Sequence, residues 1–171
     1  GFVYIKEGKK ITPLLTGGGQ EKEMRSTTEN VAGIAATAKA LRLAMENQEV
    51  FASKTQQMKE VIRKELANYP DVTVFSGEDH FAPHILTFGI KGVRGEVVVH
   101  AFEEFDIYIS TTSACSSKAG KPAGTLIAMG VDKSIAQTAV RLSLDIENDM
   151  SQVEQFLTKF KLIYEQTRKV R

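Results

Sequence analysis

The sequence predicts a mixed α/β (α+β) fold in which a small sheet packs against helices. Amphipathic helical patterns occupy residues 31–66 and 149–163. Between residues 72 and 144, short β-favouring runs alternate with short helical patterns. With 171 residues, 42% of them hydrophobic, the chain is long enough to bury a full core. We therefore expect one domain or slightly more.

The N-terminal residues combine a strand pattern with a glycine-rich loop. Residues 1–5 carry an alternating apolar face that favours a strand, and a turn follows at residues 6–9. Because the chain begins inside this strand pattern, we expect it to be the C-terminal part of something longer. Residues 17–19 are consecutive glycines, which let a backbone approach a ligand closely. A plain flexible connection is the alternative.

Two helical patterns follow the glycines. Ser26 and Glu29 have the spacing of a capping box, which predicts a helix start there. The free amides of this helix start, with Thr hydroxyls beside them, form a candidate anion site, and simple capping is the alternative. The pattern falters at residues 46–48, resumes and ends near residues 68–70. The expected apolar stripes are Val31, Ile34, Ala35, Ala38, Leu41 and Met45 in the first helix, and Val50, Phe51, Met58, Val61, Ile62 and Leu66 in the second.

The remaining elements are short until the last helix. Asn148 or Asp149 is expected to cap that helix, which carries Val153, Phe156, Leu157, Phe160 and Ile163 on one face. The patterns before it predict strands at residues 72–75, 84–90, 107–110 and 140–144, and helices at residues 95–105, 124–129 and 134–138.

Composition and charge argue against several classes of function. Lys and Arg number 22 against 21 Asp and Glu, so a net charge of +1 predicts no direct binding to nucleic acid or to a membrane. No apolar run reaches the length of a membrane span, and the single cysteine fits a reducing, cytoplasmic compartment. The histidines His80, His84 and His100 lack metal-ligand spacing, so we expect loop or packing roles and no metal.

Two residues stand out as candidates for chemistry. Cys115 lies in a run of small hydroxyl residues after a predicted strand, where hydrogen bonds would favour its thiolate. A reactive nucleophile and a small buried hydrophobe are both open interpretations. Arg141 lies between Val140 and Leu142 in a predicted strand, so it must pair with a carboxylate of the protein or bind the carboxylate of a ligand.

Five short motifs occur in a fixed order from residue 17 to residue 144. They are GGGQE at residues 17–21, RSTTEN at 25–30, SACSS at 113–117, AMG at 128–130 and VRLSL at 140–144. In this order and spacing they resemble cysteine desulfurases, the NifS/IscS-like members of the class V aminotransferase family, which are pyridoxal-phosphate enzymes of fold type I. The form of the SACSS motif resembles the long-loop group of that family.

The resemblance implies a fold, a domain division and an activity. The sheet would be mostly antiparallel, in a small C-terminal domain at residues 70–171 that carries the cysteine loop. Residues 29–69 would form bridging helices, and residues 1–28 the end of the large cofactor domain. The full-length parent would be a homodimer that uses pyridoxal phosphate to remove sulfur from L-cysteine. The products would be alanine and a persulfide, which a sulfur-acceptor protein of iron-sulfur cluster assembly or tRNA thiolation would receive.

The resemblance also assigns roles to single residues. Cys115 matches the nucleophile that takes the sulfur, and Arg141 matches the arginine that holds the substrate carboxylate. Thr28 matches the threonine that hydrogen-bonds the cofactor phosphate in the neighbouring subunit's site. The family's Schiff-base lysine would precede residue 1, and Lys6, Lys9 and Lys10 do not match it. This chain alone is therefore expected to be inactive.

The sequence departs from the family's usual glycines at three positions, and it has Gly124 where a histidine is frequent in the family. Thr27, Thr112 and Asp145 stand where the family usually has glycine, and a β-branched threonine would be strained where φ is positive. Two other functions remain open. One is another class V aminotransferase-like lyase, and the other is a noncatalytic sulfur-carrier or interaction module in which Cys115 receives sulfur from elsewhere or merely packs.

Overall fold

The computed structural model describes residues 1–77, 80–111 and 124–169. Its contacts divide the chain into two compact units, Gly1–Gln48 and Glu49–Arg171. Each unit is described by itself below. The predicted mixture of helices with a small antiparallel sheet is confirmed, and the sheet lies entirely in the second unit.

The first unit contains one helix, α1 (Val31–Glu46), whose start differs from the prediction. Asn30 is the N-cap, and its side-chain oxygen accepts a hydrogen bond from the Gly33 N–H at 2.9 Å. The predicted capping box of Ser26 and Glu29 is wrong, because the Ser26 hydroxyl donates instead to the Gly18 carbonyl at 2.8 Å. Ser26 is buried at this contact and closes the glycine-rich loop.

The predicted strand at residues 1–5 is also wrong. The strands of the described chain pair only with one another, and residues 1–5 are not among them. Phe2, Val3 and Tyr4 are more than 70% exposed, because an alternating pattern forms a strand only where a neighbouring strand supplies hydrogen bonds. The predicted turn after them is confirmed by the hydrogen bond from the Lys9 N–H to the Lys6 carbonyl.

The apolar stripe of α1 is present in the sequence but is not buried. No side chain of α1 is buried in the described chain, and Val31 and Met45 are 72% and 66% exposed. A helical stripe becomes a core face only where another element covers it. The predicted break between the helices is confirmed, because α1 is capped by Asn47 and α2 (Gln48–Leu66) follows at once.

The second helix buries a face that is rotated from the predicted one. Val50 and Val61 were expected inside and are exposed, whereas Thr55 and Lys59 are fully buried. The buried residues keep helical spacing, because they recur at intervals of three or four residues. They are Thr55, Met58, Lys59, Ile62 and Leu66.

In the described part of the chain, four short strands form one antiparallel sheet in the order β1-β2-β4-β3. They are β1 (Val72–Val74), β2 (Ile85–Ile90), β3 (Ser110–Thr111) and β4 (Ala139–Ser143). The strand predicted at residues 107–110 begins only at Ser110. The Ile107 N–H bonds back to the Phe102 carbonyl, and Asp106 turns the chain with φ of 57°, so the preceding residues are held by the helix end instead.

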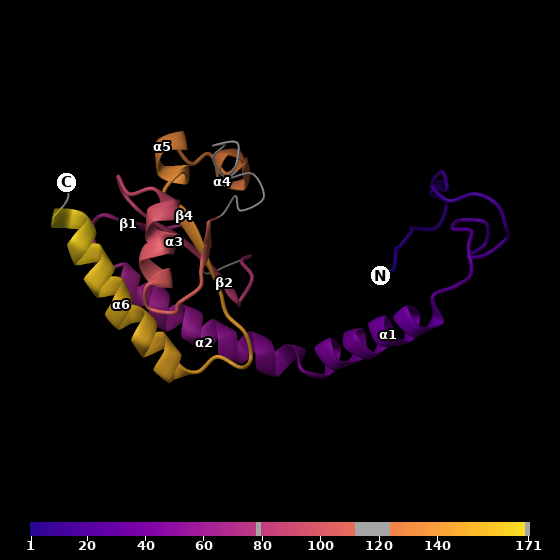
Figure 1. Ribbon diagram of the computed structural model, residues 1–171, viewed down its shortest axis with the longest axis horizontal. Helices are drawn as coiled ribbons and strands as arrows, with labels where there is room; N and C mark the ends of the chain where they lie inside the picture. The colour runs from indigo at the N-terminus through magenta and orange to yellow at the C-terminus, as the bar shows by residue number, and fades with distance from the viewer. Residues whose placement is uncertain (78–79, 112–123, 170–171) are drawn as a thin grey trace. The chain divides into compact units, whose positions relative to one another are not determined.

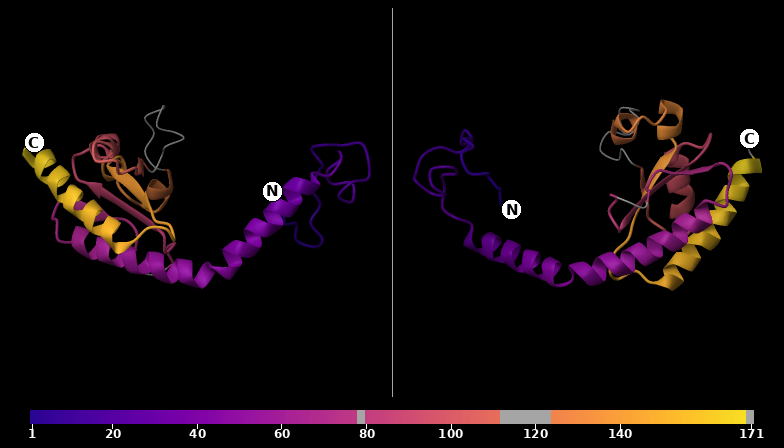
Figure 2. Two further views of the ribbon diagram at one scale, coloured as in Figure 1. Left: turned by 60° about the horizontal axis from the view of Figure 1, so that its bottom comes forward. Right: turned by 180° about the vertical axis from the view of Figure 1, so that it is seen from behind.

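Among the described residues, three helices cover one face of this sheet. The core joins α2 with α3 (Gly95–Glu103) and α6 (Met150–Lys169) over alternate strand residues. Figures 1 and 2 show α2 and α6 running side by side beneath the sheet. The strand residues in this core are Leu86, Phe88, Ile90, Val140 and Leu142.

The last helix begins as predicted. Asp149 caps α6, because its carboxylate accepts a hydrogen bond from the Gln152 N–H at 2.9 Å. The predicted apolar face is confirmed, with Val153, Phe156, Phe160 and Ile163 buried and Leu157 packed against them. Two shorter helices, α4 (Gly124–Ala128) and α5 (Lys133–Ala136), lie between β3 and β4 in the chain.

Candidate functional site

Arg141 lies in β4, an interior strand of the sheet. Its neighbours Val140 and Leu142 are buried in the core, whereas Arg141 itself is exposed. Because successive side chains of a strand point to opposite faces, Arg141 leaves the sheet on the face away from the helical core. The apolar neighbours in the sequence therefore face the core, and the guanidinium faces outward.

Polar residues flank Arg141 on both neighbouring strands. Thr87 of β2 and Ser110 of β3 are its direct cross-strand partners. Within the described residues, no carboxylate forms an ion pair with Arg141, and its guanidinium makes no hydrogen bond. The ion pair with a protein carboxylate is therefore not observed in this part of the chain, and binding of a ligand carboxylate stays a prediction.

The described residues on either side of the cysteine-bearing segment lie near Arg141 in the sheet. Cys115 and Thr112 lie outside the described residues, but both flanks of their segment are described. On one side Thr111 pairs with Val140 of β4, and on the other Leu126 packs with Ala139. Both flanks therefore meet the first residues of β4, next to Arg141.

Two glycines let the start of β4 fit between β2 and α3. A Cβ atom added at Gly89 would overlap Thr138 Oγ1 and would lie 3.1 Å from the Thr138 carbonyl. A Cβ at Gly95 would lie 2.9 Å from the carbonyl oxygen of Ala139. The absence of these two side chains sets the path of the chain into Arg141.

Thr28 lies in the first unit, two residues before the N-cap of α1. It is exposed, and no hydrogen bond to its hydroxyl occurs in the described residues. Asn30 already caps the helix, so capping does not use Thr28. A free hydroxyl beside the positive end of a 16-residue helix suits an anion such as phosphate.

Backbone strain is concentrated just before Thr28. Thr27 has φ of 109°, which is costly for a β-branched residue and agrees with the expectation of strain at this position. Glu21, Lys22 and Glu23 have φ of 51°, 55° and 64°, three left-handed residues in succession that the sequence analysis missed. Asp145, the other described position where the family usually has glycine, does not have a positive φ.

Lys59 was missed as a buried cation. Its side chain is fully buried, and its ammonium donates a hydrogen bond to the Ala82 carbonyl at 2.9 Å. Loss of hydration lowers the pKa of Lys59 below its usual value, an effect that the nearby Glu60 carboxylate opposes. The predicted stripe of this helix contained only apolar residues, because periodicity alone does not identify a buried lysine with a carbonyl partner.

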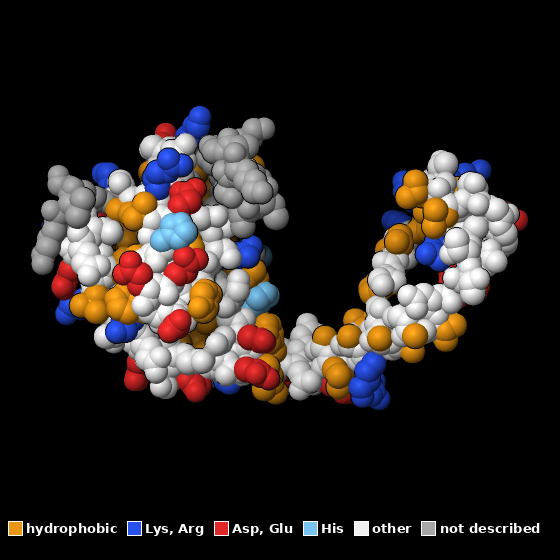
Figure 3. Space-filling view, in the orientation of Figure 1, with side chains coloured by type: hydrophobic (Ala, Val, Ile, Leu, Met, Phe, Trp, Pro, Cys, Tyr) orange, Lys and Arg blue, Asp and Glu red, His pale blue; other side chains and the backbone are white. Residues whose placement is uncertain are grey.

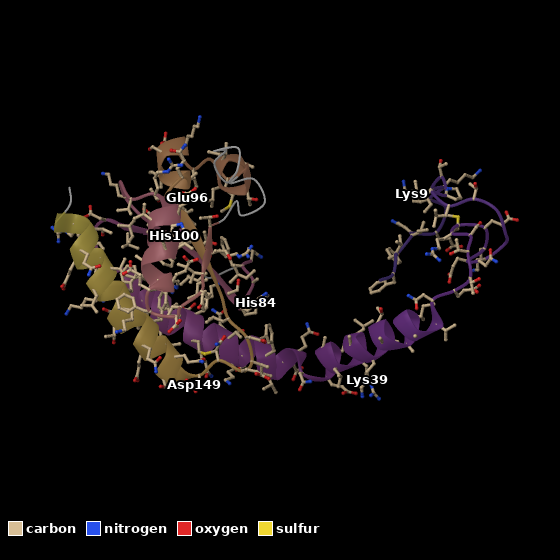
Figure 4. The ribbon with its side chains drawn as sticks, in the orientation of Figure 1. Lys9, Lys39, His84, Glu96, His100 and Asp149 are labelled. Atoms are coloured by element: carbon tan, nitrogen blue, oxygen red, sulfur yellow. The ribbon has the colours of Figure 1, made fainter. Side chains whose placement is uncertain are left out.

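The described histidines serve packing and surface roles. The His84 ring lies 5.2 Å from the Phe51 ring, and the exposed His100 contacts Glu103 at 2.7 Å. Figure 4 shows His84 in the turn before β2 and His100 on α3, and Figure 3 shows acidic side chains gathered on the face around His100. No group of three or more potential metal ligands occurs among the described residues.

Comparison with known proteins identifies the family of this chain. Residues 1–156 match the family model described as aminotransferase class-V. The chain belongs to the class V aminotransferase family.

Its relatives carry a more specific name. A NifS/IcsS protein homolog of Lactobacillus delbrueckii subsp. bulgaricus is 47% identical over 171 residues, which cover 99% of this chain and 44% of the relative. A cysteine desulfurase IscS of Clostridium botulinum is 34% identical over 173 residues, with the same two coverages. The solved structure of a NifS-like protein superimposes with a TM-score of 0.78 at 32% identity and covers 96% of this chain and 41% of that one. The chain thus spans less than half the length of these relatives.

No helix in the described part of the chain is long and apolar enough to cross a membrane.

Proposed function

We propose that this chain is the C-terminal portion of a homodimeric, pyridoxal-phosphate-dependent cysteine desulfurase. The observation that carries the proposal is the position of Arg141, exposed on the outer face of β4 beside the flanks of the segment that holds Cys115. The names of the relatives support it.

The proposed reaction transfers the sulfur of L-cysteine to Cys115. Arg141 binds the substrate carboxylate through its planar fork of N–H donors. The Cys115 thiolate attacks the substrate sulfur and forms a sulfur–sulfur bond, while the bond between that sulfur and the substrate Cβ breaks. Cβ keeps the electron pair and takes a proton, so L-cysteine and a protein thiol become L-alanine and a protein persulfide. The persulfide then passes to a sulfur-acceptor protein.

The described residues suit the cofactor at its phosphate. The free Thr28 hydroxyl and the N-terminal end of α1 offer donors to an anion, and we assign this contact to the neighbouring subunit's site. When bound, pyridoxal phosphate supplies the electron sink for bond breaking at the substrate Cα and Cβ. The lysine that anchors it is assigned to residues upstream of this chain.

The test is the transfer of sulfur in the complete natural protein. L-cysteine should yield L-alanine, and a tryptic peptide containing Cys115 should gain the mass of one sulfur atom. Cys115→Ser should abolish both while leaving the visible absorption of the bound cofactor unchanged. Unchanged alanine formation in Cys115→Ser would refute the assignment.

Arg141→Lys tests the carboxylate contact separately. Replacement of a bidentate fork by a point charge should raise the KM for L-cysteine by about tenfold or more. Arg94→Lys is the matched control, because Arg94 is exposed and pairs only loosely with Glu96 at 3.6 Å. Equal KM values for the two variants would show that Arg141 does not bind the substrate carboxylate.

A further inference from the structure

Two hydroxyl side chains flank Arg141 and make no hydrogen bond in the described part of the chain. Thr87 and Ser110 are its direct cross-strand neighbours, so all three side chains leave the same face of the sheet. Both flanking residues are partly buried. In the described part of the chain, neither hydroxyl makes a hydrogen bond, although the Thr87 backbone N–H bonds to Ser76 Oγ at 2.9 Å.

Buried hydroxyls elsewhere in this unit are satisfied by the protein itself. Thr55 donates to the Phe51 carbonyl and Thr138 to the Ile135 carbonyl, each at 2.7 Å. Polar groups withdrawn from water normally find such partners. The two hydroxyls beside Arg141 are therefore available to a ligand that reaches this row of the sheet.

The row also has the shape of a carboxylate site. Direct cross-strand neighbours have Cβ atoms about 4.5–5.5 Å apart, so the two hydroxyls lie at the foot of the arginine side chain. The residues next along this face toward the start of β4, Gly89 and Ala139, are buried, whereas Ser143 on the other side of Arg141 is exposed, so solvent reaches the row from that side. A carboxylate has about four acceptor positions, and a guanidinium fork occupies two of them.

We propose that Thr87 and Ser110 complete the carboxylate site of Arg141. Their hydroxyls donate hydrogen bonds to the carboxylate of the bound α-amino acid, at the acceptor positions that the guanidinium leaves free. The proposal rests on the proposed function, because it extends the substrate site assigned there to Arg141. In this proposal, Thr87 of β2, Arg141 of β4 and Ser110 of β3 together recognise the α-carboxylate.

The test compares ligands with and without a carboxylate in the complete natural protein. L-alanine carries the carboxylate and no sulfur, and ethylamine is the same molecule without the carboxylate. Thr87→Val and Ser110→Ala should each weaken L-alanine binding, measured by calorimetry, by about tenfold. The KM for L-cysteine should rise by a similar factor, with kcat little changed. Thr87→Ser should restore binding, and it keeps the test available if the valine variant does not fold.

Thr73→Val is the matched control. Thr73 lies on the same face of the sheet but in edge strand β1, opposite Gly89 and outside the row of Arg141. It should leave the binding of both ligands unchanged. Ethylamine should bind Thr87→Val and Ser110→Ala as it binds the parent protein.

The outcomes separate this proposal from the proposed function. If Arg141→Lys weakens L-alanine binding while Thr87→Val and Ser110→Ala behave like Thr73→Val, the hydroxyl proposal is overturned and the proposed function stands. If these two variants weaken ethylamine binding as well, their role is structural and the hydroxyl proposal is again overturned. If Arg141→Lys leaves L-alanine binding unchanged, the assigned substrate site itself is wrong.

Discussion

Replacement of Gly89 by alanine tests the packing that places β4 and Arg141. The new Cβ would overlap Thr138 Oγ1 and crowd the Thr138 carbonyl at 3.1 Å. Thr138 is only 5% exposed and donates to the Ile135 carbonyl, so it cannot rotate away without losing that bond. Overpacking costs about 1–3 kcal/mol, and the lost hydrogen bond adds about 1 kcal/mol. We expect Gly89→Ala to lower the free energy of unfolding by about 2–4 kcal/mol.

Urea unfolding followed by far-ultraviolet circular dichroism measures this change. Gly124→Ala is the matched control, because its Cβ would meet nothing within 4 Å and Gly124 does not have a positive φ. The control should be neutral or stabilising by up to about 1 kcal/mol, since alanine restricts the unfolded chain more than glycine does.

A double-mutant cycle identifies the contact responsible. Thr138→Ala removes the hydroxyl that the new Cβ would strike, so Gly89→Ala should cost less in that background than in the parent protein. Two results would refute the reasoning. One is a Gly89→Ala variant within about 0.5 kcal/mol of Gly124→Ala, and the other is a cycle in which the two substitutions simply add.

Three further predictions concern single residues. Asp149→Ala removes the cap that binds the Gln152 N–H and should cost about 1 kcal/mol, whereas Asp149→Asn should cost little; equal thermal midpoints for the two variants would contradict this. Burial lowers the pKa of Lys59 below its usual 10.5 in the folded chain, so the unfolded chain binds more protons between the two pKa values. The free energy of unfolding of the parent protein, minus that of Lys59→Met, should therefore rise as pH increases toward 10.5. Urea unfolding at several pH values measures this difference, and a difference that does not change with pH would contradict the prediction. Thr27→Gly should relieve a backbone held at φ of 109° and stabilise this loop by about 1 kcal/mol, whereas Thr28→Gly should not stabilise it. The measurement is the protection of the amides of residues 16–30 from hydrogen exchange, and equal protection in the two variants would contradict the prediction.

Elements whose apolar residues are buried in the core of the second unit were predictable from the sequence. The last helix carries apolar residues at helical spacing and an Asp cap, and both features appear in α6 as expected. The alternation around Arg141 likewise predicted a strand with an isolated polar residue, because a strand with one buried face alternates by necessity. Neither pattern depends on knowledge of a distant partner.

Elements that depend on a distant partner were not predictable. Residues 1–5 and the stripe of α1 have the correct periodicity, but within the described chain nothing pairs with the first or buries the second. Ser26 has the spacing of a capping residue, yet its hydroxyl bonds across the glycine loop to Gly18. The cross-strand neighbours of Arg141 are set by a register that the sequence does not state, so Thr87 and Ser110 became candidates only in the structure.

The strand order has a consequence for how this unit folds. The strand β4 is the last in the chain but lies between β2 and β3, and residues 112–139 separate Thr111 from its partner Val140. The β1–β2 pair can form early from nearby residues, whereas β3 has no partner until β4 inserts, which makes closure of this long loop a late step. Closure entropy rises by only about 0.6 kcal/mol for each doubling of loop length. The connection between Thr111 and Val140 can therefore change in length with little penalty to the sheet.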